Sequence, residues 1–576
     1  MTDPTDHPRP LLRRRWTSLD GEWGFTAGPE ELPGPSAFDR PITVPFAPEA
    51  PASGIGTRDR LGPVWYRREL DGSRHADGRR TLLHLGAVDR LATVFADGRA
   101  VAHHEGGYDE VVADVTGASV VVVRADDDPD DLDAPRGKQE WRDEPHSIWY
   151  PRTTGIWRTA WLEEVPATAI SALEWVTDTL AMTVTMRVRI EGHVRPGTSV
   201  RFRLRHGSRL VAEASASVLQ PEVEVTTRIG DGGIDDRWGL QWFPRRPVLL
   251  DADVEVVDGA GGIIDAVESY TALRTVDVRD GMVCLNGCPY PLRLVLDQGY
   301  WPETGLTPPD GAALRRDVEL TLALGFNGAR KHQKVEDPRW FAWADRLGLL
   351  TWVELPSAYR PGATASSRLL AEWARIVAAH RNHPSVIAWV PINESWGVPA
   401  AASDPRQRAL IEALSAATDA LDGTRPVSPN DGWETTGGSI VGVHDYTQDA
   451  AVLAARFADA AAVDAVLTGG LPSGHRVDLD GWGAEGRAVV LSEFGGVALA
   501  DDEEATWGYQ RASSPDDLLE RYRSLWAAVH ESTALAGACW TQLTDTYQEA
   551  NGLLRMDRTP KVPLEAFAAA TRGKRA

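Results

Sequence analysis

Two glutamates stand where short apolar runs end, and together they could cleave a glycosidic bond. Glu394 closes the run 386–393, and Glu493 closes the run 488–492. Runs of this kind are typical of buried parallel strands, which puts each carboxylate at the carboxyl end of a strand. Cleavage of a glycoside needs one protonated carboxyl to release the leaving group and one ionised carboxylate on the other side of the sugar. The pair predicts this chemistry, although one strand-end glutamate alone is a weak signal.

The neighbours of the two glutamates favour different roles for them. Asn393 offers an amide that can hold a sugar hydroxyl, and the indole of Trp396 can pack on the sugar or on Glu394. Apolar packing raises the pKa of a carboxyl, as a general acid requires. The glycines at 495–496 let the backbone turn away from Glu493, which makes Glu493 the natural nucleophile. These residues alone do not exclude the reverse assignment.

The elements that position the glutamates form a pattern of strands alternating with amphipathic helices after Leu285. The candidate strands are residues 290–299, 325–331, 349–356, 386–395, 425–431, 440–446, 488–496 and 535–545. Eight such units predict a (β/α)8 TIM barrel over residues 277–576, with Glu394 at the end of strand four and Glu493 at the end of strand seven. Active sites of this fold lie at the carboxyl ends of the strands, where both glutamates are expected.

Two all-β modules precede this barrel. Residues 1–166 contain short apolar runs separated by Asp/Gly turns, and residues 167–276 contain alternating strands in a module of immunoglobulin size. The sequence therefore predicts a multidomain chain with an N-terminal β-sandwich, an immunoglobulin-like β-sandwich and a C-terminal barrel.

Composition excludes several classes of partner. The formal net charge of −23 opposes nucleic acid and anionic membranes, and no run reaches transmembrane length. No secretory signal is visible before residue 16, so a cytoplasmic protein is expected. The three cysteines (Cys284, Cys288 and Cys539) are expected to be reduced thiols, and without a second ligand cluster no metal or other cofactor is expected. The 22 tryptophans offer flat apolar faces that suit sugars.

The order of several short motifs resembles glycoside hydrolase family two, the group of β-galactosidases, β-glucuronidases and β-mannosidases. Segments similar to the family's sugar-binding jelly roll are residues 16–23, 64–68, 85–89 and 154–157. Segments similar to its barrel are residues 325–330, 393–394, 492–495, 540–545 and 551–553. The resemblance covers nearly the whole chain and implies a jelly-roll fold for the first module.

The resemblance implies a role for each matching residue. Glu394 is the expected acid/base and Glu493 the nucleophile of a retaining double displacement. Asn393 would bind the sugar hydroxyl beside the reacting carbon, and Tyr446 would donate a hydrogen bond to Glu493, unless it only packs inside the barrel. Further candidates for the sugar subsite are Asp297, Arg330, His332, His444 and, as an aromatic platform, Trp540. For His332 a purely structural role is an equal alternative.

Three places bear on specificity. The charges of the basic loop Arg136–Gln139 favour a solvated surface turn. In the family, however, a loop of the jelly roll can reach the barrel mouth, so this loop is also a candidate substrate contact. Glu549 stands where glucuronide-cleaving members carry an Asn-x-Lys-Gly signature, and it is expected to repel a uronic acid. The segment 296–301 differs from the His-rich segment of the best-known β-galactosidases, which leaves their metal site and sugar preference open here.

The expected function is that of an exo-acting hydrolase of neutral glycosides, with β-galactosides as the leading substrates. A β-mannosidase or a furanosidase that acts on β-galactofuranosides is an alternative within the family. A catalytically silent carbohydrate-binding protein is an alternative from another class. The expected partner is a small oligosaccharide or glycoside, without nucleic acid or membrane, and a homo-oligomer is compatible with the sequence.

Overall fold

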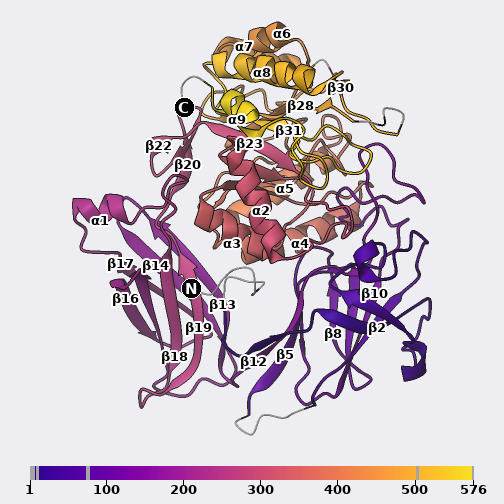
Figure 1. Cartoon of the computed structure of the whole chain (residues 1–576). Helices are drawn as coiled ribbons and strands as arrows, with labels where there is room; N and C mark the ends of the chain where they lie inside the picture. The colour runs from indigo at the N-terminus through magenta and orange to yellow at the C-terminus, as the bar shows by residue number, and fades with distance from the viewer. Residues whose placement is uncertain are drawn as a thin grey trace.

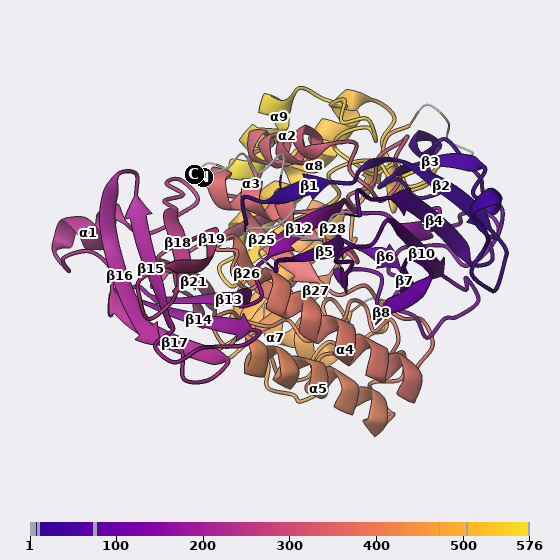
Figure 2. The same cartoon turned by 90° about the horizontal axis from the view of Figure 1, so that it is seen from below.

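A computed structural model describes residues 7, 12–72, 78–471, 473–500, 502 and 505–573. Figure 1 shows the C-terminal part of the chain above two β-rich units, with the first unit, in indigo, at the lower right and the second, in magenta, at the lower left. The view from below in Figure 2 places the two units on opposite sides, with α4 and α5 of the C-terminal part between and below them. The predicted multidomain architecture is confirmed.

The first unit packs two antiparallel sheets face to face. One sheet has the order β1 (Trp16–Ser18), β12 (Ala160–Val165), β5 (Arg80–Leu85), β9 (Val111–Asp114). The other has the order β3 (Arg40–Val44), β2 (Gly21–Ala27), β4 (Val64–Glu69), β10 (Val120–Asp126), β7 (Leu91–Ala96), β8 (Arg99–Glu105). Apolar side chains from both sheets, among them Trp23, Leu85 and Val123, form one buried cluster. Alternation of buried and exposed residues along each strand produces this core.

Short elements complete the first unit. They are β6 (Val88–Asp89), paired with β11 (Gly155–Ile156), and the 3-10 turns η1 (Pro35–Ala37) and η2 (Pro51–Ser53). Between β10 and β11 the chain runs through residues 127–154 without a regular strand. This long connection carries the basic loop Arg136–Gln139.

The second unit is a smaller pair of antiparallel sheets. One has the order β13 (Ala169–Asp178), β14 (Thr183–Glu191), β17 (Glu222–Arg228), and the other the order β16 (Arg209–Ser217), β15 (Ser199–His206), β18 (Leu250–Val257), β19 (Ile263–Thr271). Helix α1 (Ile234–Gly239) lies between β17 and β18 in the chain. In β14 the apolar residues at even positions are buried, and they share a core with β15 and β18. The strict alternation in the sequence explains why this unit forms a half-buried pair of sheets.

The C-terminal part contains the predicted parallel barrel. Its strands have the order β26 (Val386–Val390), β25 (Leu350–Glu354), β24 (Gly328–Lys331), β23 (Leu292–Asp297), β31 (Gly537–Thr541), β28 (Ala488–Gly495), β27 (Ile440–His444). Every residue of β24 to β28 is buried, which agrees with the continuous apolar runs in the sequence.

The expected fifth strand, residues 425–431, is not a regular strand. It pairs in parallel only at Trp389–Val427 and Asn393–Asp431, and the Ile440 N–H donates to the Val427 carbonyl at 3.3 Å. Pro426 and a second proline at 429 lack the N–H groups that a regular ladder requires. The segment nevertheless links β26 to β27 and so closes the ring.

Helices surround the barrel strands. They are α2 (Gly311–Ala323), α3 (Pro338–Leu347), α4 (Ala363–His380), α5 (Pro405–Leu421), α6 (Ala450–Arg456), α7 (Ala460–Gly469), α8 (Pro515–Glu531) and α9 (Leu564–Arg572). An aspartate side chain caps the first turn of five of them, at Asp310, Asp337, Asp404, Asp449 and Asp459. Such caps satisfy backbone N–H groups that have no partner inside the helix. In the part of the chain that is described, the apolar stretches of these helices are too short or too polar to cross a bilayer.

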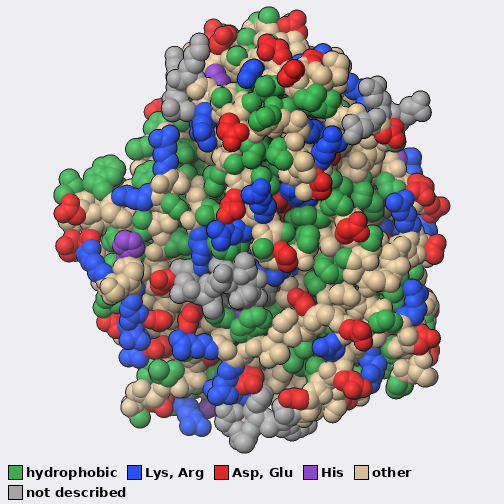
Figure 3. All heavy atoms as spheres, in the orientation of Figure 1, with side chains coloured by type: hydrophobic (Ala, Val, Ile, Leu, Met, Phe, Trp, Pro, Cys, Tyr) green, Lys and Arg blue, Asp and Glu red, His purple; other side chains and the backbone are tan. Residues whose placement is uncertain are grey.

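Smaller strands flank the barrel. They are β20 (Val276–Arg279), β21 (Met282–Leu285) and β22 (Cys288–Pro289) before it, and the pair β29 (Val497–Ala498) and β30 (Gln510–Arg511) after β28. On the face drawn in Figure 3, acidic and basic side chains are interspersed rather than gathered by sign.

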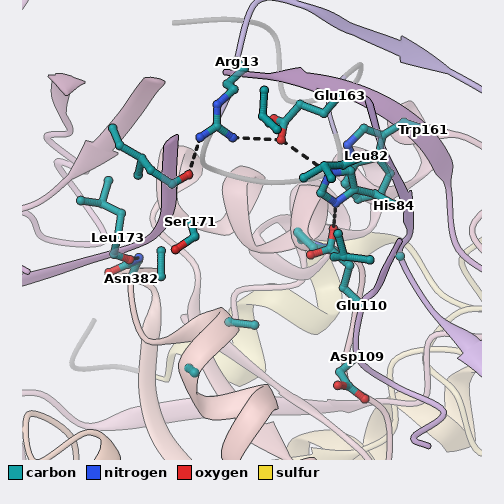
Figure 4. Close-up of a pocket in the computed structure, with 18 of the residues that line it drawn as sticks. Arg13, Leu82, His84, Asp109, Glu110, Trp161, Glu163, Ser171, Leu173 and Asn382 are labelled. Atoms are coloured by element: carbon teal, nitrogen blue, oxygen red, sulfur yellow. Dashed lines mark hydrogen bonds and ion pairs between the residues drawn. The ribbon is translucent and has the colours of Figure 1, made fainter. Parts of the chain in front are cut away.

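The three parts meet around a cavity of about 470 Å³ between the two β units and α4. Figure 4 shows Arg13 directed at Glu163 and His84 lying between Glu163 and Glu110. Arg13 also pairs with Asp265 of the second unit at 2.8 Å, and Glu372 of α4 accepts two backbone N–H groups of the first unit at 2.9 Å each. Arg13 thus joins the first unit to the second, and the hydrogen bonds to Glu372 join the first unit to α4 of the barrel.

Candidate active site

The structure brings Glu394 and Glu493 together at the carboxyl ends of the barrel strands. A carboxylate oxygen of each and a ring nitrogen of His444 all lie within 4.8 Å of one another. Glu493 lies inside β28, and Glu394 follows β26 in the left-handed region at φ +48°, as does Ser395 at +54°. Non-glycine residues with such backbone angles cost free energy and concentrate at functional sites.

Arg330 of β24 is the electrostatic centre of the site. Its fully buried guanidinium pairs with Glu354 at 2.7 Å, with Glu493 at 2.8 Å and with Asp431 at 3.1 Å. Burial alone would lower the pKa of Arg330, but Asp431, Glu354 and Glu493 outweigh it and raise this pKa. Arg330 therefore stays charged and holds one oxygen of Glu493 in place.

The amide of Asn393 is oriented by the same guanidinium. Its Oδ1 accepts a hydrogen bond from Arg330 at 2.5 Å, so its NH2 group points elsewhere. Within the described residues this buried Nδ2 has no hydrogen-bond partner. A buried donor without a partner costs free energy, and a sugar hydroxyl would satisfy it. The geometry is compatible with the expected role of Asn393.

Tyr446 donates its phenolic proton to the second oxygen of Glu493 at 2.5 Å. Burial and then the charge of Glu493 raise the pKa of Tyr446 well above its usual value, so the phenol stays protonated. Glu493 thus receives hydrogen bonds from a cation and a phenol, which hold both of its oxygens in place. This is the environment that a nucleophilic carboxylate requires.

His444 links the other glutamate to the network. Its Nδ1 lies 2.8 Å from Glu394 Oε1, and its Nε2 lies 3.1 Å from Asp431 Oδ2. Burial would lower the pKa of His444, but Glu493, Asp431 and Glu394 outweigh it and raise this pKa to about 10. At neutral pH His444 is therefore an imidazolium between carboxylates.

The expected rise in the pKa of Glu394 is wrong. Burial raises this pKa, but the hydrogen bond and charge of His444, followed by the charge of Lys138, outweigh burial and lower it. The apolar neighbour Trp396 was visible in the sequence, whereas the cations come from β27 and from the first unit. Glu394 is consequently one member of a hydrogen-bonded pair with His444 rather than an isolated carboxyl.

Two further sequence candidates, His332 and Asp297, lie at the site in different ways. His332 is buried, and its Nδ1 lies 3.1 Å from Glu354 and 4.0 Å from Glu493. Burial, then Lys138 and Arg330, lowers the pKa of His332 well below its usual value, so the ring is neutral. Asp297 ends β23, where its carboxylate pairs with the ammonium of the buried Lys331 at 2.6 Å.

The structure does not support Trp540 as an aromatic platform. Its ring has no exposed surface and packs edgewise against Phe494 and Tyr522, with ring centroids 5.1 Å and 4.5 Å away. The motif correctly places Trp540 on the barrel strand β31. Side chains alternate between the two faces of a strand, and the ring of Trp540 is on the face that packs against the helices.

Aromatic side chains from separate loops gather beside Glu394 instead. Trp396 contacts Tyr359 of the loop after β25 and Trp149 of the first unit, with centroids 5.3 Å and 5.7 Å away. Because these three come from distant parts of the chain, no short motif predicts their meeting. Their partly exposed rings are better placed to receive a sugar or its aglycone than Trp540.

Two buried acids were also missed by the sequence analysis. Glu354 closes β25 and Asp431 ends the irregular fifth segment, and both are fully buried against Arg330. Glu354 follows an apolar run just as the two catalytic candidates do. The same signal, a carboxylate at the end of a buried strand, could therefore have identified it.

The loop Arg136–Gln139 is not the solvated surface turn that its charge suggests. Arg136, Lys138 and Gln139 are all at most 5% exposed. The backbone N–H groups of Arg136 and Gly137 both donate to the Ser357 carbonyl at 3.1 Å. The loop is therefore docked on the barrel, because it pairs with a barrel loop through its backbone rather than through its charges.

Comparison with known proteins agrees with this architecture. The family model described as "Glycosyl hydrolases family 2, TIM barrel domain" matches residues 362–455. A β-galactosidase of Thermoanaerobacter pseudethanolicus is 25% identical over 346 residues, which cover 58% of this chain and 44% of that protein. A putative β-glucuronidase of Formosa agariphila is 26% identical over 371 residues, which cover 60% of this chain and 42% of that protein. The chain thus spans less than half the length of these relatives.

Solved structures share the fold over nearly the whole chain. The β-glucuronidase of Bifidobacterium dentium in complex with coumarin-3-O-glucuronide has a TM-score of 0.77 at 18% identity, covering 98% of each chain. A β-galacturonidase of Eisenbergiella tayi bound to galacturonate has a TM-score of 0.73 at 17% identity, covering 98% of this chain and 99% of that one. The matched segment 362–455 and the β-galactosidase and β-glucuronidase relatives support glycoside hydrolase family 2 as the family of this chain, and the solved structures show its fold.

Proposed function

We propose that this protein is a retaining, exo-acting glycoside hydrolase with Glu493 as nucleophile and Glu394 as acid/base. The observation that carries the proposal is the approach of the two carboxylates, with oxygens within 4.8 Å. Retaining enzymes hold their carboxyl groups about 5–5.5 Å apart, whereas an inverting water needs about 6.5–9.5 Å. The spacing favours direct attack by a carboxylate over attack by an intervening water.

The contacts of each glutamate support its role in a double displacement. Glu493, held by Arg330 and Tyr446, attacks the anomeric carbon while the leaving-group oxygen takes a proton from the Glu394–His444 pair. The bond from the anomeric carbon to the aglycone breaks, and a glycosyl ester of Glu493 forms. Glu394 then accepts a proton from water, and that water breaks the ester and releases the sugar with its original configuration.

We further propose residues 1–166 as a jelly-roll domain, 167–276 as an immunoglobulin-like domain and 277–576 as the catalytic barrel. The first domain contributes Lys138, Trp149 and Tyr150 to the barrel mouth, and these side chains would close one side of the sugar subsite. A subsite closed in this way accepts the end of a chain, which supports exo action. The leading substrate is a neutral β-galactoside, with β-mannosides and β-galactofuranosides as alternatives.

A panel of nitrophenyl glycosides tests this function. The panel contains β-galactoside, β-mannoside, β-galactofuranoside, β-glucuronide and β-galacturonide under one buffer. We expect turnover of a neutral member with kcat/KM at least about tenfold above that of either uronide, since about 1.4 kcal/mol of differential transition-state binding gives a factor of ten. A uronide preference would overturn the substrate ranking. Turnover of none would favour a silent carbohydrate-binding protein.

The His444 imidazolium predicts the pH dependence of the enzyme. His444→Gln should move the alkaline limb of kcat/KM to lower pH by at least about one unit, because the wild-type pair keeps its proton up to about pH 10 and a lone glutamate does not. The folded pKa is raised, so the stability that His444 contributes is complete below its unfolded pKa of about 6.5. That stability is lost as pH rises toward 10.

Two measurements check this prediction. Profiles of kcat/KM against pH locate the limb, and urea unfolding shows whether the stability difference between wild type and His444→Gln shrinks from pH 6.5 to pH 10. The exposed His103, on β8 of the first unit, provides the control, and His103→Gln should change neither. If the alkaline limb of His444→Gln did not move, the Glu394–His444 pair would not be the group that holds the catalytic proton.

A further inference from the structure

The side chain of Lys138 is buried at the barrel mouth, and within the described residues its ammonium group has no partner. Lys138 is 5% exposed, and among the described residues its Nζ makes neither a hydrogen bond nor an ion pair. Through its backbone carbonyl, Lys138 accepts the Tyr150 N–H at 2.8 Å. Burying a cation without a counter-charge in contact is costly, so this position favours a role toward a bound molecule.

The surroundings of Lys138 place its charge inside the site. Its charge contributes to lowering the pKa of His332 and of Glu394, and it is the strongest influence that opposes burial at Glu549. These three groups follow different barrel strands. Lys138 therefore lies near Glu394 and near Glu549 of the loop after β31.

The backbone around Lys138 is held rigidly against the barrel. Tyr359 donates its phenolic proton to the Gly137 carbonyl at 2.7 Å, in addition to the two N–H groups that bond to Ser357. Gly137 has φ +60°, and a Cβ at this position would lie 2.2 Å from the Gln333 carbonyl oxygen. Only glycine allows this close approach, so the loop presents Lys138 in one defined position.

Glu549 is fixed beside the same loop by two donors. Tyr150 donates its phenolic proton to Oε2 at 2.5 Å, and Asn551 donates from Nδ2 to Oε1 at 3.0 Å. The carboxylate is 3% exposed, and each of its oxygens keeps further acceptor capacity. Tyr150 donates one hydrogen bond to the Lys138 carbonyl and one to the Glu549 carboxylate, so it fixes the position of Glu549 relative to the backbone of Lys138.

We propose that Lys138 and Glu549 form a clamp for neighbouring hydroxyl groups of a neutral sugar, which sets the specificity of the site. An ammonium only donates and a carboxylate only accepts, whereas each sugar hydroxyl does both. A sugar carboxylate would gain the attraction of Lys138 but would meet Glu549 and Glu394 nearby, so the paired charges favour an uncharged ligand. This inference rests on the proposed function, because it names the substrate class of the same site.

Opposite single substitutions test the clamp through the ratio of kcat/KM for the neutral glycoside to that for the matching uronide. Glu549→Gln leaves Lys138 unbalanced and should lower this ratio at least about tenfold, whereas Lys138→Met leaves Glu549 unbalanced and should raise it. Lys138→Met should also lower kcat/KM for the neutral glycoside at least about tenfold, and Lys138→Arg should restore part of it. Charge-matched controls are Arg142→Met and Glu144→Gln, both exposed on the same connection.

Deoxy substrates separate a hydroxyl contact from a general loss of charge. One monodeoxy glycoside should be cleaved by wild type and Lys138→Met at the same rate, because the hydroxyl that Lys138 binds is already absent. Thermal unfolding of each variant shows whether it is folded. A ratio that moves in the same direction in both variants, or not at all, would overturn the clamp while leaving the hydrolase proposal intact.

A wild-type protein without turnover would instead contradict the proposed function. Calorimetric binding of the free neutral sugar and of its uronic acid to wild type, Lys138→Met and Glu549→Gln then tests the clamp without catalysis. The same opposite shifts in the ratio of affinities are expected, and equal shifts would contradict the clamp.

Discussion

Glu493→Ala is expected to lose activity toward every glycoside, with kcat/KM falling by at least about 10⁴-fold, because the carboxylate proposed to form the glycosyl ester is removed. Leaving-group quality should not rescue the variant, since protonation is not the missing step. Azide should restore cleavage by entering the vacated space and attacking the anomeric carbon from the side of Glu493. The product is then a glycosyl azide of inverted configuration.

The control for this variant is Glu485→Ala, an exposed glutamate just before β28, which should retain full activity. Thermal unfolding shows whether Glu493→Ala is folded, since it leaves Arg330 with one carboxylate fewer. An azide product of retained configuration would mean that Glu493 is the acid/base and that the two roles must be exchanged.

Glu394→Ala is expected to separate substrates by their leaving groups. Glycosides with poor leaving groups should lose about 10²- to 10⁴-fold in kcat/KM, the usual contribution of general acid–base catalysis, whereas activated aryl glycosides should keep their first step. Hydrolysis of the glycosyl ester then becomes limiting, because no base activates water. Azide needs no base and should give a glycosyl azide of retained configuration.

Pre-steady-state kinetics with a dinitrophenyl glycoside measure this directly. A burst of released phenol followed by slow turnover is expected for Glu394→Ala, and Glu412→Ala, an exposed site on α5, provides the matched control. Equal losses for good and poor leaving groups would show that Glu394 does not act as the proton donor.

The sequence predicts the positions of the two proposed catalytic glutamates because their signal is local. A continuous apolar run ending in a carboxylate defines a buried strand and its carboxyl end, and Glu394 and Glu493 both have this context. The same reasoning places Arg330 and Asn393 correctly at strand ends. It fails at the fifth strand, where the two prolines interrupt the ladder.

What depends on distant contacts could not be predicted in this way. The lowered pKa of Glu394 requires His444 of β27 and Lys138 of the first unit, which lie 50 and 256 residues away in the chain (444 − 394 and 394 − 138). The burial of the Arg136–Gln139 loop depends on backbone contacts with Ser357, which its polar composition conceals. Trp540 is the opposite case, because the sequence motif suggests an exposed ring at the site. Its ring instead packs between Phe494 and Tyr522, and the motif does not contain this contact.

The configuration of the first product tests the central claim most directly. Proton NMR during hydrolysis of a β-glycoside that the enzyme cleaves follows the anomeric proton of the released sugar before mutarotation. A double displacement through Glu493 predicts that the β-anomer appears first and the α-anomer only later. First appearance of the α-anomer would contradict the account, because it requires a single displacement by water.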